Sequence, residues 1–149
     1  MMTILTIIFL VIDIVSKLVI SNFMRVSDSI MIIENFFYIT YVRNTGAAWS
    51  IFAGKTWMLI MISLIIISII VWYIFKNKPK NNLEKISYSM ILGGSVGNLF
   101  DRIIYGYVID FLDFNLFGYD YPIFNLADCF IFVGVLMLII YTWRCNDGD

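Results

Sequence analysis

The chain alternates between long apolar runs and shorter polar stretches, and this pattern predicts helices that cross a membrane. The clearest run extends from Trp57 to Phe75 and contains no charged residue. A helix of that length matches the hydrocarbon core of a bilayer, which is about 30 Å thick. Three further apolar runs, at residues 3–20, 86–104 and 128–143, carry polar residues. We therefore expect a membrane α-helical protein with four transmembrane helices, forming one integral membrane domain over residues 1–149.

Composition supports this class and excludes several others. Of the 149 residues, 61% are hydrophobic and 14% charged, against about 45–50% and about 25% in soluble domains. A net charge of −1 gives no basic surface for nucleic acid. The absence of histidine excludes Ser-His-Asp and Cys-His catalysis and histidine-bearing zinc sites. Cys129 and Cys145 lack metal-site spacing, so we expect neither a metal nor another cofactor.

The basic residues predict the orientation of the helices. Lys76, Lys78, Lys80 and Lys85 crowd the connection between the second and third runs. The positive-inside rule puts this connection in the cytoplasm. Both termini are then cytoplasmic as well, and the connections at about 22–56 and 105–126 face outward.

The outward-facing connections have a composition of their own. Residues 30–42 are rich in β-branched and aromatic types, which predicts strand structure and a small sheet lying on the outer membrane surface. Residues 107–124 mix apolar residues with aspartates. We expect them to form an interfacial helix or loop on the same side.

Charged residues inside the apolar runs need an explanation, because each costs at least about 2.5 kcal/mol at membrane depth. Asp13 and Lys17 are spaced i, i+4 and share a helix face. They either form an ion pair that stabilises the first helix or contact a ligand directly.

The third run contains GGSVGNLFDR at residues 93–102. Gly93 and Gly97 form a G-x-x-x-G motif that lets a neighbouring helix approach closely. Asn98, Asp101 and Arg102 follow at i, i+3, i+4 on one face. Two hypotheses remain open for these three, a structural hydrogen-bond network and substrate binding.

Two aspartates lie next to the predicted outer ends of the last two helices. Asp128 opens the fourth run, where helix capping alone would explain it. Asp110 lies just beyond the third run and has no such explanation. Two carboxylates that meet in an apolar setting tend to share one proton, which supplies an acid and a base together. A turn with small residues, NTGAAW at 44–49, is expected on the same side.

These segments together resemble the bacterial signal peptidase II family over nearly the whole chain. The motifs appear in order as D-x-x-S-K at 13–17, N-x-G-A-A-W at 44–49, G-G-x-x-G-N-x-x-D-R at 93–102, V-I-D-F at 108–111 and F-N-x-A-D at 124–128. Ser95 and Ile109 depart from the usual alanine and valine of the family and leave every charged group unchanged.

The resemblance implies an aspartyl endopeptidase of the bacterial inner or plasma membrane. It would remove signal peptides from prolipoproteins, on the N-terminal side of a cysteine that carries diacylglycerol. Its partners would be this substrate, membrane lipids and cyclic-peptide inhibitors of the globomycin type. By position in the motifs, the catalytic pair would be Asp110 and Asp128. The residues that bind substrate or inhibitor would be Asn44, Gly46, Asn98, Arg102 and Asn125. The supporting residues would be Asp13, Lys17 and Asp101.

Two alternatives belong to other classes of protein. A membrane transport or binding protein would line a path with its charged residues, but this chain has no internal repeat, and the charged residues inside its apolar runs lie near the outer side. A Ser-Lys hydrolase would need Lys17 and a distant serine such as Ser50 or Ser95.

Overall fold

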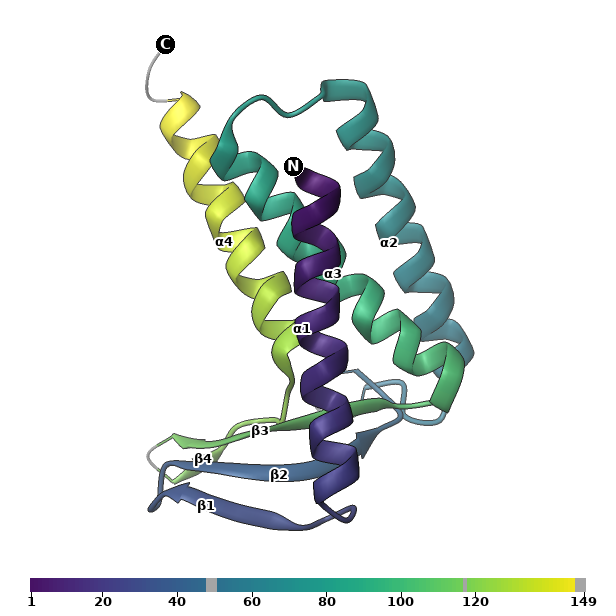
Figure 1. Ribbon diagram of the computed structural model, residues 1–149, viewed down its shortest axis with the longest axis vertical. Coiled ribbons are helices and arrows are strands. Elements are labelled where there is room, and N and C mark those ends of the chain that lie inside the picture. The colour runs from purple at the N-terminus through teal and green to yellow at the C-terminus, as the bar shows by residue number, and fades with distance from the viewer. Residues whose placement is uncertain (48–50, 117, 147–149) are drawn as a thin grey trace.

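A computed structural model of the chain describes residues 1–47, 51–116 and 118–146, with the side chains of Cys145 and Asn146 left out. These described residues form four helices and four strands. In chain order these are α1 (Met2–Phe23), β1 (Ser29–Ile33), β2 (Phe37–Asn44), α2 (Thr56–Asn77), α3 (Asn82–Tyr105), β3 (Val108–Leu116), β4 (Tyr119–Asp120) and α4 (Leu126–Asn146). The helices run alongside one another and the sheet lies across one end of them (Figure 1).

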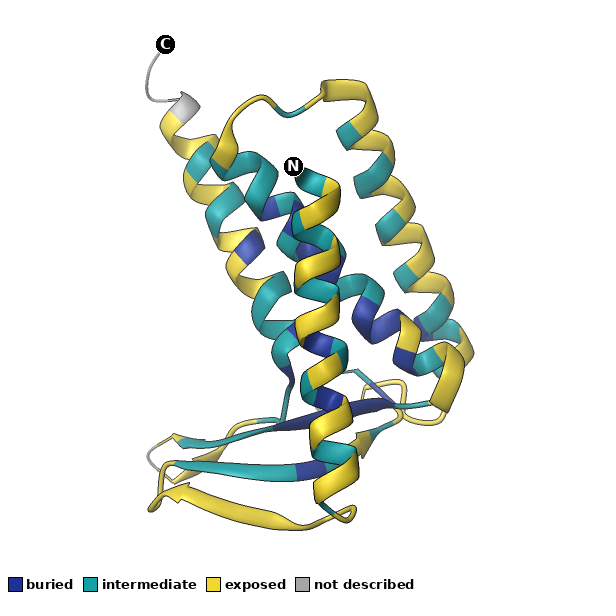
Figure 2. Ribbon diagram, in the orientation of Figure 1, coloured by how far each residue is buried: buried dark blue, intermediate teal, exposed yellow. Residues whose placement is uncertain are grey.

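Each of the four predicted spans lies inside one of these helices, so the prediction of four long helices is confirmed. Three of them, Met2–Phe23, Thr56–Asn77 and Leu126–Arg144, are long and apolar enough to cross a membrane. The remaining helix, α3, packs against each of the other three. It also carries most of the buried helical residues, as Figure 2 shows. The buried polar residues of α3 are therefore enclosed by the elements packed around it.

Glycines on α3 let two helices approach it closely, as the G-x-x-x-G motif predicts. A Cβ atom at Gly93 would lie 2.7 Å from the Cβ atom of Phe9 on α1. A Cβ atom at Gly94 would collide with the backbone oxygen of Ala127 on α4. A Cβ atom at Gly97 would collide with the carboxylate of Asp13. Side chains at these positions would separate the helices, so the glycines fix the contacts of α1 and α4 with α3.

The strands form an antiparallel sheet in the order β1-β2-β3-β4. Residues 30–42 were predicted as strand, and they form a hairpin, because the chain turns at Asn35, whose φ is +54°. The expectation of an interfacial helix or loop over 107–124 is wrong for Val108–Leu116 and Tyr119–Asp120, which are strands. Residues from Val108 to Leu116 pair with β2, and the chain then turns at Gly118, whose φ is +87°, into β4. Cross-strand pairing with β2 outweighs the aspartates that made this segment resemble a loop.

The sheet holds Asp110 on the face away from the end of α1. Tyr41, Ile109 and Phe111 form a buried cluster that packs against Ile20 and Met24 near the end of α1. Successive side chains of a strand point to opposite faces, so Asp110 points away from this cluster. Val42 of β2 pairs with Asp110 and thereby fixes its position along the sheet.

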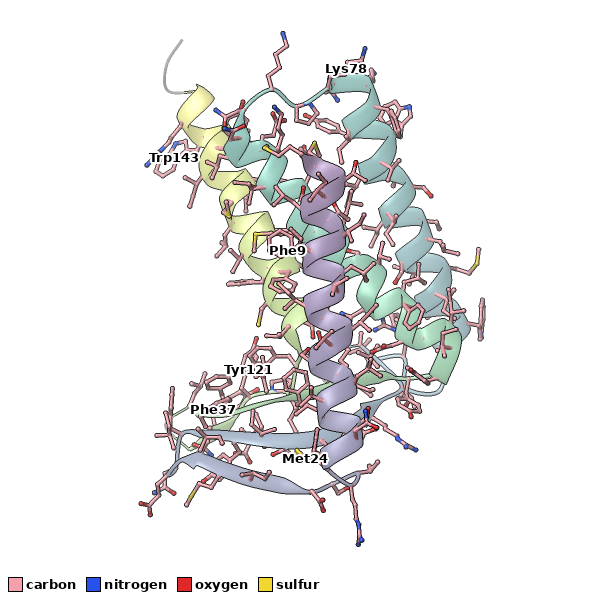
Figure 3. The ribbon with its side chains drawn as sticks, viewed as in Figure 1. Phe9, Met24, Phe37, Lys78, Tyr121 and Trp143 are labelled. Atoms are coloured by element: carbon pink, nitrogen blue, oxygen red, sulfur yellow. The ribbon has the colours of Figure 1, made fainter. Side chains whose placement is uncertain are left out.

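The two ends of the molecule differ in chemistry. Figure 3 shows Lys78 and Trp143 at the end away from the sheet, and Met24, Phe37 and Tyr121 at or near the sheet. The lysine-rich connection thus lies at the opposite end of the helices from the sheet and from Asp110.

Candidate active site

Asp110 is buried in the middle of the sheet, with only 3% of its surface exposed. Its Oδ2 atom accepts a hydrogen bond from Nδ2 of Asn44 at 2.8 Å, and its Oδ1 atom accepts one from Nδ2 of Asn125 at 2.7 Å. Burial, and secondarily the negative charge of Asp128, raise the pKa of Asp110 to about 7, although the two amide donors oppose the shift. A carboxyl group with this pKa can hold or release a proton near neutral pH.

Asp128 lies in the first turn of α4 and faces the same cavity as Asp110. Its Oδ1 atom accepts a hydrogen bond from Nδ2 of Asn98 at 2.8 Å, and its Oδ2 atom accepts one from the backbone N–H of Asn125 at 3.2 Å. The capping role predicted for Asp128 is thus present. The aspartates are linked through Asn125, which hydrogen-bonds to both of them.

The cavity has a volume of about 880 Å³ and a polar region around the two aspartates. Asn44, Asn98 and Arg102 contribute to this region. Such a volume falls within the range of ligand-binding sites, about 300–1,000 Å³. The remaining walls are mostly apolar.

One apolar wall is aromatic and the other is a face of α4. Phe36, Phe114, Tyr121 and Phe124 line the cavity on the side of the sheet, with the rings of Phe114 and Phe124 stacked at 5.7 Å. Their aromatic character was visible in the sequence, but only the pairing of the strands brings them together. The wall on α4 includes Ile131, Phe132 and Val135.

A buried lysine supports the site from behind. Nζ of Lys17 lies 2.8 Å from Oδ2 of Asp13 and 3.0 Å from Oδ2 of Asp101, and it donates a hydrogen bond to Oδ1 of Asn98 at 3.0 Å. Asp13 also accepts a hydrogen bond from the backbone N–H of Ala127, and Asp101 accepts one from that of Ile109. This cluster therefore ties α1, α3, α4 and β3 together. The ion-pair interpretation of Asp13 and Lys17 fits this geometry, because both are almost fully buried and neither lines the cavity.

Arg102 reaches the cavity from α3. Its Nη1 atom donates to the backbone oxygen of Asn98 at 3.3 Å, and its Nη2 atom donates to that of Gly46 at 3.4 Å. Nε of Arg102 is buried without a hydrogen-bond partner among the described residues. Arg102 thus holds the turn that contains Gly46 against the polar end of the cavity.

The structure brings most of the predicted site residues to one place, in different roles. Asn44, Asn98 and Arg102 line the cavity, whereas Asn125 is fully buried. Gly46 takes part through its backbone, which accepts from Arg102 and donates to Oδ1 of Asn44. The end of the NTGAAW motif, Ala48 and Trp49, lies outside the described residues, as does Ser50.

Lys17 is engaged in a way that does not favour the Ser-Lys hypothesis. Its partners among the described residues are two carboxylates and one amide, with no serine hydroxyl. Of the two candidate serines, Ser95 lies among the described residues, and there it makes no hydrogen bond to Lys17.

Apolar helices together with two convergent carboxylates beside a cavity define an integral membrane protein with a site of the aspartic peptidase type. Comparison with known proteins identifies the family. The family described as "Signal peptidase (SPase) II" matches residues 5–144. The chain therefore belongs to the signal peptidase II family, whose members are aspartic peptidases. This membership also argues against the transport hypothesis.

Curated relatives agree over nearly the full length. The chain is 40% identical to the lipoprotein signal peptidase of Halothermothrix orenii over 144 residues, which are 97% of this chain and 96% of the relative. It is 42% identical to that of Staphylococcus haemolyticus over 137 residues, 92% of this chain and 87% of the relative. It is also 42% identical to that of Staphylococcus aureus over 139 residues, 93% of this chain and 85% of the relative.

Two solved structures described as bacterial membrane enzymes share the fold. One matches with a TM-score of 0.91 and 35% identity over 99% of this chain and 90% of that chain. The other matches with a TM-score of 0.85 and 37% identity over 95% of this chain and 91% of that chain. The chain is therefore a multi-pass membrane protein with three to four helical spans and an antiparallel sheet.

Proposed function

We propose that this chain is a membrane aspartyl endopeptidase that cleaves prolipoproteins N-terminal to a diacylglyceryl-modified cysteine, with Asp110 and Asp128 as the catalytic pair. The activity of its family is the removal of signal peptides from prolipoproteins. The observation that carries the residue assignment is the convergence of the two aspartates on one end of an apolar cavity.

The reaction is hydrolysis by a pair of carboxyl groups that share one proton. The ionised aspartate takes a proton from a water molecule, and the oxygen of that water attacks the scissile carbonyl carbon. The protonated aspartate donates its proton to the carbonyl oxygen. When the C–N bond breaks, the leaving amine receives the proton taken from water, and a hydroxyl proton of the tetrahedral intermediate returns to the other aspartate. The pair is then ready for another cycle.

The walls of the cavity support a lipid-bearing substrate. From Asp128, the apolar wall on α4 continues to Val135, a rise of about 10 Å along the helix axis. Phe132 on this wall is 65% exposed, so the cavity is bordered by surface that lipid would cover. An acyl chain attached next to the scissile bond would fit this wall. A peptide in extended form would lie across the polar end, beside Asn44 and Arg102.

The arrangement of the whole chain supports a fourth span and an outward-facing site. We assign α3 as a transmembrane helix, enclosed by α1, α2 and α4, and residues 1–149 as one integral membrane domain. The lysine-rich connection at Lys76–Lys85 lies at the end away from the sheet (Figure 3). By the positive-inside rule that end and both termini are cytoplasmic. The sheet and the site then lie at the outer surface of the bacterial inner or plasma membrane.

A cyclic peptide of the globomycin type would bind in the same cavity and block it. Asn44, Asn98 and Arg102 line the polar part of the cavity that such a peptide would contact. Gly46 would contribute through its backbone, which lies beside Asn44 and Arg102.

The test is cleavage by the purified protein in lipid. We expect a single cut before the lipidated cysteine, located by mass spectrometry of both products, and inhibition by the cyclic peptide. The matched control is the same precursor without its diacylglyceryl group, which should be a much poorer substrate. Equal cleavage of both precursors, or a cut elsewhere, would overturn the proposal.

A further inference from the structure

Asn125 makes hydrogen bonds to both aspartates and has almost no capacity left for a substrate. Its Nδ2 atom donates to Oδ1 of Asp110 at 2.7 Å and to Oδ1 of Asn98 at 3.0 Å, which uses both of its protons. Its Oδ1 atom accepts from the backbone N–H of Asp128 at 3.1 Å. The side chain is fully buried. These contacts suit a residue that holds other residues in position.

Asn125 and Asp128 together form a capping box at the start of α4. The helix begins at Leu126, so Asn125 is its N-cap and Asp128 its third residue. Oδ1 of Asn125 accepts from the N–H of Asp128, and Oδ2 of Asp128 accepts from the N–H of Asn125. This reciprocal pair is the arrangement that satisfies free N–H groups at a helix start. A negative charge at this position is also favoured by the helix dipole.

Asp110 has a different setting. It lies on a strand rather than in the first turn of a helix, and its two donors are neutral side-chain amides from Asn44 and Asn125. Burial, and secondarily the charge of Asp128, raise the pKa of Asp110 to about 7. The neutral form of Asp110 is therefore favoured while Asp128 is charged.

The charged groups around the pair favour the same assignment. Lys17 on α1 donates to the side chain of Asn98, and Arg102 on α3 donates to its backbone oxygen. Asn98 in turn donates to Asp128. Both cations therefore contact Asn98, the residue that donates a hydrogen bond to Asp128. The other nearby carboxylates, Asp13 on α1 and Asp101 on α3, are paired with Lys17.

We infer that Asn125 is a positioning residue that fixes the two aspartates relative to each other, with Asp128 as the ionised member and Asp110 as the proton carrier in the resting enzyme. The inference rests on the proposed function and assigns its steps. Asp128 takes the proton from water and later gives it to the leaving amine. Asp110 gives its proton to the carbonyl oxygen and regains one when the tetrahedral intermediate collapses, so no proton is gained or lost over a cycle.

Asn125→Ser separates the positioning role from the capping role. A serine N-cap still accepts from the N–H of Asp128 and preserves the helix start, but it removes both amide donors. The matched control is Asn81→Ser, because Asn81 is the N-cap of α3 and its Oδ1 atom accepts from the N–H of Leu83 at 2.8 Å. Thermal unfolding of both variants shows whether the helices are retained.

We expect Asn125→Ser to lower kcat about ten- to a hundredfold and to leave KM for the lipidated precursor unchanged. Asp110 becomes charged when it gives its proton to the carbonyl oxygen, and the variant then lacks one hydrogen bond to that charged group. The pH above which activity falls should rise, because the ionised form of Asp110 loses a donor. Asn81→Ser should change neither quantity. A higher KM with an unchanged pH limit would overturn the inference in favour of direct substrate binding. An unchanged kcat would overturn it in favour of capping alone.

The proton assignment can be tested on the unaltered enzyme. An epoxide is opened by an ionised carboxylate, whereas a diazo reagent esterifies a protonated carboxyl group. Peptide mapping of protein treated with each reagent should find the epoxide adduct on Asp128 and the diazo ester on Asp110. The reverse pattern would overturn the assignment while leaving the peptidase function intact. Failure of the function itself would instead appear as the absence of cleavage by the unaltered enzyme.

Discussion

The buried Lys17 predicts a large change in the free energy of unfolding when its charge is removed. Lys17 pairs with Asp13 at 2.8 Å and with Asp101 at 3.0 Å, in a place where the side chains are at most 4% exposed. Lys17→Met removes the charge with little change in volume and leaves both carboxylates without a cation. Removing one partner of a buried ion pair costs about 3–5 kcal/mol. We expect the free energy of unfolding to fall by that amount.

A second substitution relieves part of this loss. Asp13→Asn in the Lys17→Met background removes one unpaired carboxylate, and the amide oxygen can still accept from the N–H of Ala127. Coupling energies between contacting residues are about 0.5–3 kcal/mol. The double variant should therefore be more stable than Lys17→Met by up to about 3 kcal/mol. Lys80→Met, at an exposed lysine in the connection before α3, is the matched control and should change stability by less than about 0.5 kcal/mol.

The assay is reversible unfolding of the purified protein in mixed micelles, followed by tryptophan fluorescence and by recovery of peptidase activity. A loss below about 1 kcal/mol for Lys17→Met would refute the reasoning, because it would mean that the three charges are effectively solvated. A double variant less stable than the single one would also refute it.

Three other predictions follow from the site and its orientation. Arg102→Lys should lower kcat/KM about ten- to a hundredfold without changing the thermal stability, because an ammonium group cannot hold two backbone oxygens as a planar guanidinium does; equal rates would contradict this. Asn44→Ala removes a donor that favours ionised Asp110, so the pKa of that carboxyl should rise above about 7 and kcat/KM should persist to higher pH; an unchanged or lower pH limit would contradict it. In a cysteine-free background, an impermeant reagent should label Lys80→Cys from the cytoplasmic side and Glu34→Cys from the outside. Labelling of both cysteines from the same side would refute the topology.

The helices were predictable from the sequence because each apolar run is long enough to define its own helix. The packing of α3 between the other three helices was not predictable from the sequence. Its run from 86 to 104 resembles a lipid-facing span with polar residues added, yet the structure packs it against three other helices. Gly93, Gly94 and Gly97 were a local sign of this packing, since they mark where neighbouring helices approach.

The sheet was only partly predictable, because strand pairing depends on residues far apart in the chain. Glu34 and Asn35 interrupt the apolar run of residues 30–42, but this break alone does not distinguish a turn from a polar position within one strand. The turn at Asn35, where φ is positive, becomes evident only from the pairing of β1 with β2. The aspartates of β3 resemble loop residues until β2 is placed beside them.

The two aspartates were found in the sequence because the predicted topology puts them at the same end of the helices. The link between the two aspartates through the hydrogen bonds of Asn125 was not found in the sequence. From the sequence, capping by Asp128 and a place for it in the active site are alternatives, whereas the structure contains both, through the hydrogen bonds of Asn125. The aromatic wall was also missed, since Phe36, Phe114 and Phe124 come from three segments that meet only in the folded sheet.

The central claim is that Asp110 and Asp128 together carry out the hydrolysis. The most direct test is single-turnover cleavage of a lipidated prolipoprotein by Asp110→Asn and by Asp128→Asn, with Asp113→Asn as the matched control. Asp113 lies on the same strand as Asp110 and accepts a hydrogen bond from Thr40, outside the cavity. We expect each of the first two variants to lose at least a factor of about a hundred in rate while remaining folded, and Asp113→Asn to stay close to the unaltered enzyme. Cleavage at a near-normal rate by either Asp110→Asn or Asp128→Asn would contradict the account.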